Sequence, residues 1–311
     1  MYTYAQLLNK TLEVLEDKGS MEAYQFISKY ADQVKGNRAQ IYNFQYCLAA
    51  SSGQEHEALQ LMEEAIIQNG FWYAYDYLMS DEDLKPLHPH KQFQKLTQLC
   101  QERENQAKAE QKPELKVLSH VDTQRPLIMA IHGDQENSSM TELHWQSVIQ
   151  DGVTLALPQS SQIEFSNAYN WDNKDKGTRE ILEHYEFLIS KNEISSNQVI
   201  LGGFSAGCGV GLNAVLTESM PVTGLILVAP WFPDLKEWQH LLSKLKDQQT
   251  KVYVICGEQD VDCLEGTNQF VELLKLNGVN HTYKLISGLD HEYPEHFEDL
   301  LSEGVEFILN N

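Results

Sequence analysis

The stretch Gln198–Leu212, QVILGGFSAGCGVGL, places one serine among glycines directly after a run of apolar residues. A sharp turn from a strand into a helix, strained at the serine, requires nearly bare positions two residues before and after it. Gly203 and Gly207 meet this requirement. The turn would also put Ser205 at a helix N-terminus, where the helix dipole favours developing negative charge. The sequence therefore predicts Ser205 as a nucleophile raised above one edge of a sheet.

The chain after Pro113 alternates short runs rich in Val, Ile and Leu with longer amphipathic stretches. Strands separated by helices predict a mostly parallel sheet with helices on both faces, in which functional residues follow the carboxyl ends of the strands. The expected strands are 114–121, 126–131, 153–157, 198–203, 223–229, 251–256 and 281–286. The expected helices are 139–150, 175–190, 206–218, 235–247, 263–277 and 293–309.

A serine hydroxyl is a poor nucleophile without a base, and the base needs an orienting acid. The strand at 251–256 is followed by Asp260, and the last strand is followed by His291, which gives the known order Ser, Asp, His. Asp262, two residues further into the same loop, is the alternative acid. His281 opens a strand and His296 falls within the expected last helix, so neither is expected to reach the serine.

Acyl transfer also needs N–H donors for the tetrahedral oxyanion. One expected donor is the backbone N–H of Ala206, the residue after the nucleophile. The other is expected from the loop in IHGDQENSS, where Gly133 lets the backbone approach closely and Asp134 or Gln135 supplies the N–H. His132 is expected to buttress this loop and not to act as a base.

Two loops carry aromatic residues that could form a substrate pocket together with Gly133. Leu157–Gly177 is long, polar and aromatic, and its Trp171 is either a pocket wall or an anchor of the loop. The segment PWFPD, 230–234, is expected to place Trp231 and Phe232 near the same opening. The chain has no long apolar insertion of the kind that forms a lipase lid, which favours small or medium soluble acyl esters.

Residues 1–112 are predicted to form a helical domain, separate from a second domain at 113–311. Apolar residues recur at helical spacing, as in the stripe Leu7, Leu8, Leu12 and Leu15. EAYQF at 22–26 returns as EALQL at 57–61, an offset of 35 residues. This half resembles a degenerate tetratricopeptide-type array with hairpins at 3–17/20–34 and 37–51/54–69, which would bind a protein partner. A plain helical bundle that caps the next domain is the alternative.

Composition narrows the function classes. The 311 residues carry a formal net charge of −22, which argues against a nucleic-acid surface and against docking on anionic membranes. The N-terminal residues lack the features of a signal peptide, and no apolar run reaches the roughly 20 residues of a membrane helix. Five scattered cysteines without metal-binding spacing suit reduced thiols, so a cytoplasmic location is expected.

The motifs HGDQEN, LPQSSQ, GGFSAG, CGEQD and GLDHEYP make residues 114–311 resemble the α/β-hydrolase superfamily. The nearest branch is that of bacterial esterases related to carboxylesterase/phospholipase and dienelactone-hydrolase-like proteins. The resemblance implies a serine esterase that forms an acyl-enzyme and needs no metal or cofactor. Ala206 stands where many relatives carry Gln, a change that leaves the backbone N–H in place. Thioester or amide cleavage, and a non-catalytic adaptor, are the alternative functions.

Overall fold

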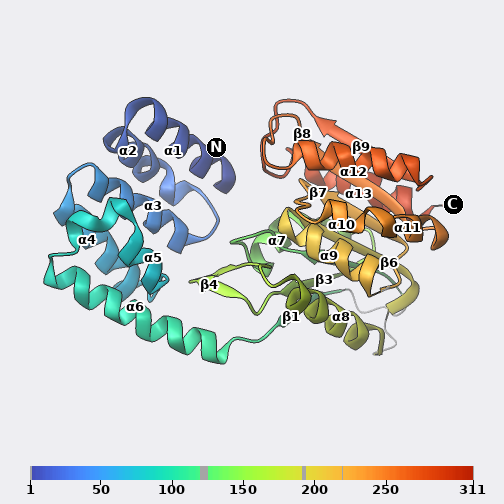
Figure 1. The fold of residues 1–311 in the computed structure, drawn as a ribbon, viewed down its shortest axis with the longest axis horizontal. Helices are drawn as coiled ribbons and strands as arrows, with labels where there is room; N and C mark the ends of the chain where they lie inside the picture. Colours follow the sequence, from blue (N-terminus) through green and yellow to red (C-terminus); the bar gives the residue numbers. More distant parts are fainter. Residues whose placement is uncertain (1, 120–124, 191–193, 219, 311) are drawn as a thin grey trace. The chain divides into compact units, whose positions relative to one another are not determined.

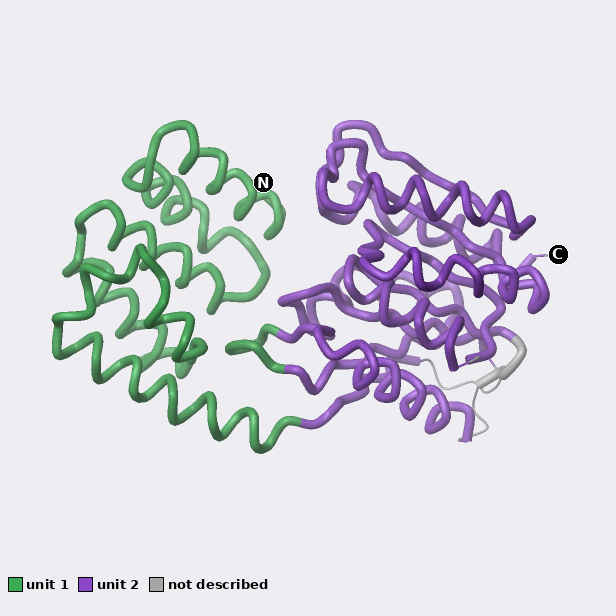
Figure 2. Tube along the Cα trace, viewed as in Figure 1, with its two compact units in different colours: residues 1–111, 163–168 green, residues 112–162, 169–311 purple. Residues whose placement is uncertain are grey.

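The computed structural model describes residues 2–119, 125–190, 194–218 and 220–310. The chain divides into two units (Figure 2). Residues 1–111 together with 163–168 form the first, here called the helical unit. Residues 112–162 and 169–311 form the second, here called the sheet unit. The helical unit is therefore built from two separate stretches of sequence.

The helical unit consists of helices, most of which contact the next helix along the chain (Figure 1). They are α1 (Tyr4–Lys18), α2 (Ser20–Tyr30), α3 (Arg38–Ser51), α4 (Glu55–Glu63), α5 (Tyr75–Ser80) and α6 (Lys91–Glu110), with short helical turns at Ala31–Gln33, Glu64–Gln68 and Glu82–Leu87. The helical character expected from the sequence is confirmed. Ala23 and Ala58, which occupy equivalent places in the sequence repeat, are both fully buried. Leu12 belongs to the apolar stripe noted in the sequence, yet it is 49% exposed, while the neighbouring Thr11 is buried.

The sheet unit contains a seven-stranded sheet in the order β1-β3-β2-β6-β7-β8-β9. The strands are β1 (Glu114–Leu118), β2 (Arg125–Ile131), β3 (Thr154–Gln159), β6 (Ile194–Phe204), β7 (Gly224–Val228), β8 (Lys251–Gly257) and β9 (His281–Ile286). Strand β1 runs antiparallel to β3, and the other neighbouring pairs are parallel. The mostly parallel sheet is confirmed. The expected first strand continued to residue 121, but residues 120 and 121 lie outside the described part of the chain.

Helices cover both faces of this sheet (Figure 1). Residues alternate between the two faces along β2, where Leu127, Met129 and Ile131 pack in one apolar cluster and Ile128 and Ala130 in the other. The first cluster is shared with α8 (Lys174–Ser190), α9 (Ala206–Thr217) and α12 (Leu264–Leu276), and the second with α7 (Ser138–Trp145) and α13 (Phe297–Leu309). This arrangement leaves the carboxyl ends of the strands for the site.

Several predicted elements differ from the structure; the expected helix 139–150, for example, ends as an α-helix at Trp145. The expected helix 235–247 is broken into α10 (Leu235–Trp238), a turn at Gln239–Leu241, and α11 (Ser243–Asp247). The last helix begins at Phe297, because His296 takes a left-handed conformation (φ 57°) that a helix interior does not accept. The loop 157–177 is not irregular throughout: β3 runs to Gln159, and a hairpin of β4 (Ile163–Phe165) and β5 (Ala168–Tyr169) follows.

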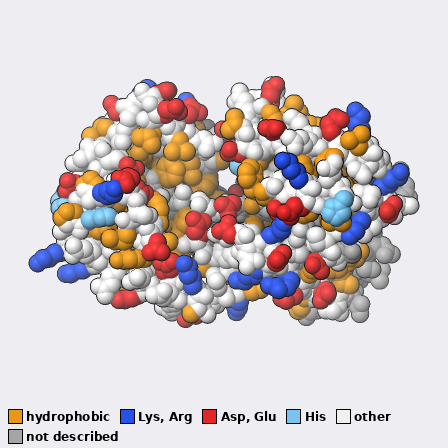
Figure 3. All heavy atoms as spheres, viewed as in Figure 1, with side chains coloured by type: hydrophobic (Ala, Val, Ile, Leu, Met, Phe, Trp, Pro, Cys, Tyr) orange, Lys and Arg blue, Asp and Glu red, His pale blue; other side chains and the backbone are white. Residues whose placement is uncertain are grey.

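The surface reflects the acidic composition. On the face drawn in Figure 3, acidic and basic side chains are interspersed with apolar ones. Among the helices of the described residues, none combines the length and the apolarity that crossing a membrane requires.

Candidate active site

The turn at Ser205 has the geometry that its flanking glycines predict. Strand β6 ends at Phe204, Ser205 lies at φ 49° and ψ −121°, and α9 begins at Ala206. A Cβ on Gly207 would lie 2.4 Å from the carbonyl oxygen of His132, so any side chain there would displace backbone. The main chain of Ser205 is held on both sides, since its N–H donates to Val228 (3.0 Å) and its carbonyl accepts from Trp231 (3.1 Å). These bonds fix a backbone conformation that costs about 1–3 kcal/mol in a residue with a side chain.

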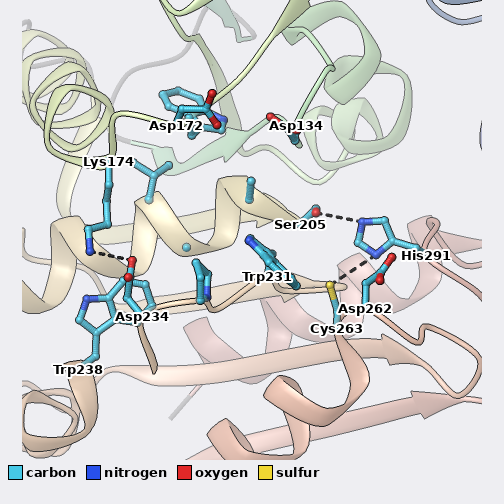
Figure 4. Close-up of a pocket in the computed structure, with 15 residues that line it drawn as sticks. Asp134, Asp172, Lys174, Ser205, Trp231, Asp234, Trp238, Asp262, Cys263 and His291 are labelled. Carbon is cyan, nitrogen blue, oxygen red and sulfur yellow. Dashed lines mark hydrogen bonds and ion pairs between the residues drawn. The ribbon is translucent and has the colours of Figure 1, made fainter. Parts of the chain in front are cut away.

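Three of the predicted site residues form a hydrogen-bonded chain, and Figure 4 shows its link between Ser205 and His291. Ser205 Oγ lies 2.9 Å from His291 Nε2, and His291 Nδ1 lies 2.9 Å from Asp260 Oδ2. Asp260 is fully buried and also accepts the backbone N–H of Cys263 through Oδ1 (3.0 Å). Asp262 lines the same pocket with an exposed side chain, whereas Asp260 makes the contact with the imidazole.

The other histidines considered lie elsewhere. His281 opens β9, as expected, and its Nδ1 lies 2.8 Å from the carbonyl oxygen of Val279. His296 precedes the last helix, and its side chain is 73% exposed beside Glu295 and Glu298. Neither lines the pocket that contains Ser205.

The surroundings of His291 change its pKa in opposing directions. Burial lowers the pKa of His291, but the hydrogen bond and the negative charge of Asp260 outweigh burial and raise it above 6.5. Cys263 Sγ lies 3.6 Å from His291 Nδ1. Burial, and then the nearby Asp260 charge, raise the pKa of the Cys263 thiol, so it stays protonated at neutral pH.

Asp260, Cys263 and His291 each offer one atom to a cluster in which all three atoms lie within 4.8 Å of one another. Such a set has the composition of a metal site. Metal binding requires the thiolate form of cysteine and a free imidazole nitrogen. The protonated Cys263 and the hydrogen bond between His291 and Asp260 fit a catalytic histidine better than a metal ligand set.

The predicted oxyanion residues come from two segments, the start of α9 and the loop that follows β2. Ala206 lines the pocket and begins α9, in the helical turn whose backbone N–H groups lack an intrahelical acceptor. Asp134 lines the pocket with an exposed side chain, whereas Gln135, at φ 55°, does not line it. Gly133 also lies outside the lining, and a Cβ there would be 2.8 Å from the ring of Phe204. Its role is to let the loop pass close to β6.

Glu136 belongs to this loop and was not singled out from the sequence. Its Oε2 accepts the backbone N–H of Gly133 at 2.8 Å. Burial raises the pKa of Glu136 to about 7, while the Gly133 hydrogen bond and the charge of His291 oppose the rise. A carboxylate in a polar loop is usually a surface group, so the only available signal was its position two residues after Asp134.

The pocket above Ser205 has a volume of about 490 Å³ and includes three tryptophans in its lining, Trp171, Trp231 and Trp238. Trp171 is both wall and anchor, because it lines the pocket while its ring stacks on His132 at 4.7 Å and its Nε1 donates to the His132 carbonyl at 2.9 Å. Trp231 is 45% exposed in the lining. Phe232 was wrongly placed at the opening: it is buried against Phe270.

Charged side chains contribute to the lining of the pocket, here called its rim. Among the described residues that line it are four aspartates, Asp134, Asp172, Asp234 and Asp262, and a single lysine, Lys174. Lys174 Nζ pairs with Asp234 Oδ2 at 2.7 Å, at the end of the pocket away from His291 (Figure 4). Neither member of this pair, nor Trp238, was picked out from the sequence, since a salt bridge across 60 residues leaves no local pattern.

Two family models match separate parts of the chain. Residues 3–108 match the family model described as "A/B hydrolase-like, N-terminal domain", and residues 163–305 match "Phospholipase/Carboxylesterase". The crystal structure of an uncharacterized protein from Bacillus cereus is 48% identical and covers 99% of each chain, with a TM-score of 0.58.

Other solved structures are more distant and cover about two thirds of this chain. Esterase PE8 is 17% identical over 64% of this chain and 100% of its own (TM-score 0.53), and a Bacillus cereus carboxylesterase is 13% identical over 65% and 98% (TM-score 0.50). At this identity they show the fold.

An acyl-protein thioesterase 1 from Gibberella zeae is 28% identical over 136 residues, which are 41% of this chain and 57% of that protein. The chain thus spans little more than half the length of this curated relative. Together the matches support a carboxylic-ester hydrolase and confirm the resemblance to the esterase branch. Residues 163–305 are thus similar to the phospholipase/carboxylesterase family of α/β-hydrolases, and residues 3–108 are similar to an α/β-hydrolase-like N-terminal domain.

Proposed function

We propose that the protein hydrolyses carboxylic esters through an acyl-enzyme on Ser205, with His291 as the base and Asp260 as its orienting acid. The observation that carries this proposal is the hydrogen-bonded chain from Ser205 Oγ through His291 to the buried Asp260, at the wall of a pocket. No cofactor is needed for this chemistry.

In the first half of the reaction, His291 Nε2 takes the proton of Ser205 Oγ as the oxygen attacks the ester carbonyl carbon. Asp260 accepts from Nδ1–H and stabilises the imidazolium that forms. The imidazolium then gives its proton to the leaving alcohol, and the acyl group stays on Ser205. Water repeats the sequence: His291 takes its proton, the hydroxide oxygen attacks the acyl carbon, and the proton returns to Ser205 as the acid leaves.

The negative charge on the tetrahedral intermediate requires two N–H donors. Ala206, at the start of α9, supplies one, and the loop Asp134–Gln135 supplies the other. Asp134 is favoured for this second donor because it lines the pocket and Gln135 does not. Removal of one such donor costs about 10²–10³ in kcat in other enzymes of this type.

The substrate we propose is a small or medium ester whose acyl and alcohol groups are neutral or cationic. The 490 Å³ pocket is of the size that holds a drug-sized ligand. Its four carboxylates and one lysine give the rim a net negative charge, which repels anionic groups. The exposed ring of Trp231 offers an apolar face that also attracts cations.

Cleavage of a thioester by the same residues is a second candidate, supported by the similarity to an acyl-protein thioesterase. A non-catalytic adaptor, in which the helical unit binds a protein partner, is the rival from another class. For the esterase too, we propose that the helical unit binds a protein partner and that the domain boundary lies near residue 112. The five free, buried cysteines support a reducing compartment such as the cytoplasm.

The test is hydrolysis of p-nitrophenyl esters from acetate to laurate by the wild type and by Ser205→Ala. Turnover that disappears in the variant, together with labelling of the wild type by a fluorophosphonate at Ser205, supports the esterase. Labelling without ester turnover redirects the search to thioesters and amides. A folded protein that neither turns over esters nor reacts with the probe would be the adaptor.

A further inference from the structure

A six-residue segment between β3 and α8 belongs to the helical unit. Residues 163–168 follow strand β3 of the sheet unit, yet they are grouped with residues 1–111. The carbonyl of Ser166 accepts from Asn37 Nδ2 (3.1 Å), its N–H donates to the Trp72 carbonyl (3.1 Å), and its Oγ accepts the Trp72 N–H (2.8 Å). Ser166 and Asn37 are both buried. All polar groups of Ser166 are thus satisfied within the helical unit.

Apolar contacts surround the buried site that Asn37 and Trp72 form for Ser166, here called the seat of Ser166. Phe165 and Ala168 are buried members of the apolar cluster of the helical unit, and the Phe165 ring stacks on Tyr73 at 6.2 Å. The backbone N–H of Ile163 donates to Gln111 Oε1 at 3.0 Å. The segment is therefore part of the core of the helical unit and does not merely touch its surface.

The residues that follow the segment contact the oxyanion loop directly. Tyr169 N–H donates to the carbonyl of Glu136 at 3.1 Å, and Trp171 Nε1–H donates to the carbonyl of His132 at 2.9 Å. Glu136 in turn accepts the Gly133 N–H through its carboxylate. These bonds hold the loop on both sides of Asp134, which faces the pocket.

The loop needs such support because of its own backbone. Gln135 lies at φ 55°, in the left-handed region, where a residue with a side chain is strained. Strained conformations persist only where the surroundings hold them. An oxyanion donor also loses much of its effect when it moves by as little as about 1 Å.

We propose that Ser166 and Asn37, through the β4–β5 hairpin, are positioning residues that let the helical unit hold the oxyanion loop and the Trp171 wall in place. The proposal rests on the esterase function proposed above. Because Tyr169 directly follows the anchored segment, release of Ser166 frees the hydrogen bonds of Tyr169 and Trp171 to the loop. The chemical step then suffers more than substrate binding.

The first experiment compares Ser166→Ala/Asn37→Ala with the wild type in the full-length protein. With p-nitrophenyl acetate, we expect kcat to fall about tenfold or more while KM changes by less than about threefold, as for a misplaced oxyanion donor. Tyr24→Phe is the matched control, because it removes a 2.9 Å hydrogen bond to Glu57 within the same unit, away from the hairpin. Its kcat should equal that of the wild type.

A second readout does not depend on activity. Hydrogen exchange measured by mass spectrometry should become faster in the peptides covering 163–172 and 130–137 together in the double variant, and in neither for Tyr24→Phe. Ser166→Arg, whose side chain cannot be accommodated in the buried seat, provides a stronger release of the segment. Retention of the native melting transition of the sheet unit shows that these variants are folded.

The following results would overturn the anchoring proposal or the esterase function. Faster exchange at 163–172 with unchanged exchange at 130–137 and unchanged kcat overturns the proposal. So does unchanged exchange at 163–172 in Ser166→Arg, because the seat then does not hold the segment. If the wild type itself lacks ester turnover and Ser205 does not react with a fluorophosphonate, the esterase function fails, while coupled exchange of the two peptides still tests the anchoring.

Discussion

Replacing Asp260 with asparagine tests which nitrogen of His291 carries the proton. The buried carboxylate contacts two groups, His291 Nδ1 through Oδ2 (2.9 Å) and the Cys263 backbone N–H through Oδ1 (3.0 Å). An asparagine side chain has only one oxygen. If that oxygen faces Cys263, its NH₂ group faces Nδ1, and His291 must carry its proton on Nε2. That proton then points at Ser205 Oγ, so His291 cannot act as its base.

The magnitude follows from these two contacts. The opposite orientation of the asparagine leaves a buried backbone N–H without an acceptor, which costs about 1–3 kcal/mol. This preference lowers the population of the productive tautomer by about 5- to 150-fold, at about 1.4 kcal/mol per factor of ten. The variant also loses the negative charge that stabilises the imidazolium. We therefore expect kcat to fall by about 10⁴, the loss found when the acid of such a triad becomes an amide.

The assay is the kcat of p-nitrophenyl acetate hydrolysis as a function of pH, after the fold has been checked by circular dichroism. Asp262→Asn is the matched control, since Asp262 lines the same pocket but does not contact the imidazole, and its kcat should stay within about threefold of the wild type. An Asp260→Asn enzyme within tenfold of the wild type, or a greater loss in Asp262→Asn, would refute the assignment of the acid.

Three further predictions concern pH, packing and charge. Because only neutral His291 can act as a base and its pKa is raised, kcat/KM should rise with pH through a midpoint above 6.5, and a lower midpoint would contradict the role of Asp260. Gly207→Ala places a Cβ 2.4 Å from a backbone oxygen and should lower the free energy of unfolding by about 1–3 kcal/mol in urea titrations, whereas Gly266→Ala, with no atom within 4 Å, should not. A cationic ester should exceed an isosteric anionic one in kcat/KM, with a ratio that shrinks in high salt and in Asp172→Asn; equal rates for both esters would argue against the acidic rim.

Much of the sheet unit could be predicted because its signals are local. The strand periodicity and the bare residues around Ser205 both act within a few positions of the residue they constrain. The site residues follow the carboxyl ends of β6, β8 and β9, so topology alone brings them to one edge. The prediction that Ser205, Asp260 and His291 would meet rested on the strands that they follow and on the known order Ser, Asp, His.

Other features depend on partners far away in the sequence. Trp231 and Phe232 are adjacent aromatic residues, yet one faces the pocket and the other packs on Phe270 in α12. The seat of Ser166 is made by residues 94 and 129 positions away. Leu12 fitted the apolar stripe of α1, but its face of the helix stays exposed. No periodicity within one element encodes these choices.

The interleaving of the two units constrains how such a gene can be rearranged. The chain passes from one unit to the other at three junctions, after residues 111, 162 and 168. A recombination event that replaced only the first 111 codons would leave Phe165 and Ser166 with a foreign protein in place of their native seat. A new N-terminal half would have to arrive together with residues 163–168, or with a shortened link between β3 and α8. We therefore expect the coding sequences of the helical unit and the sheet unit to be exchanged together, although each unit has its own core.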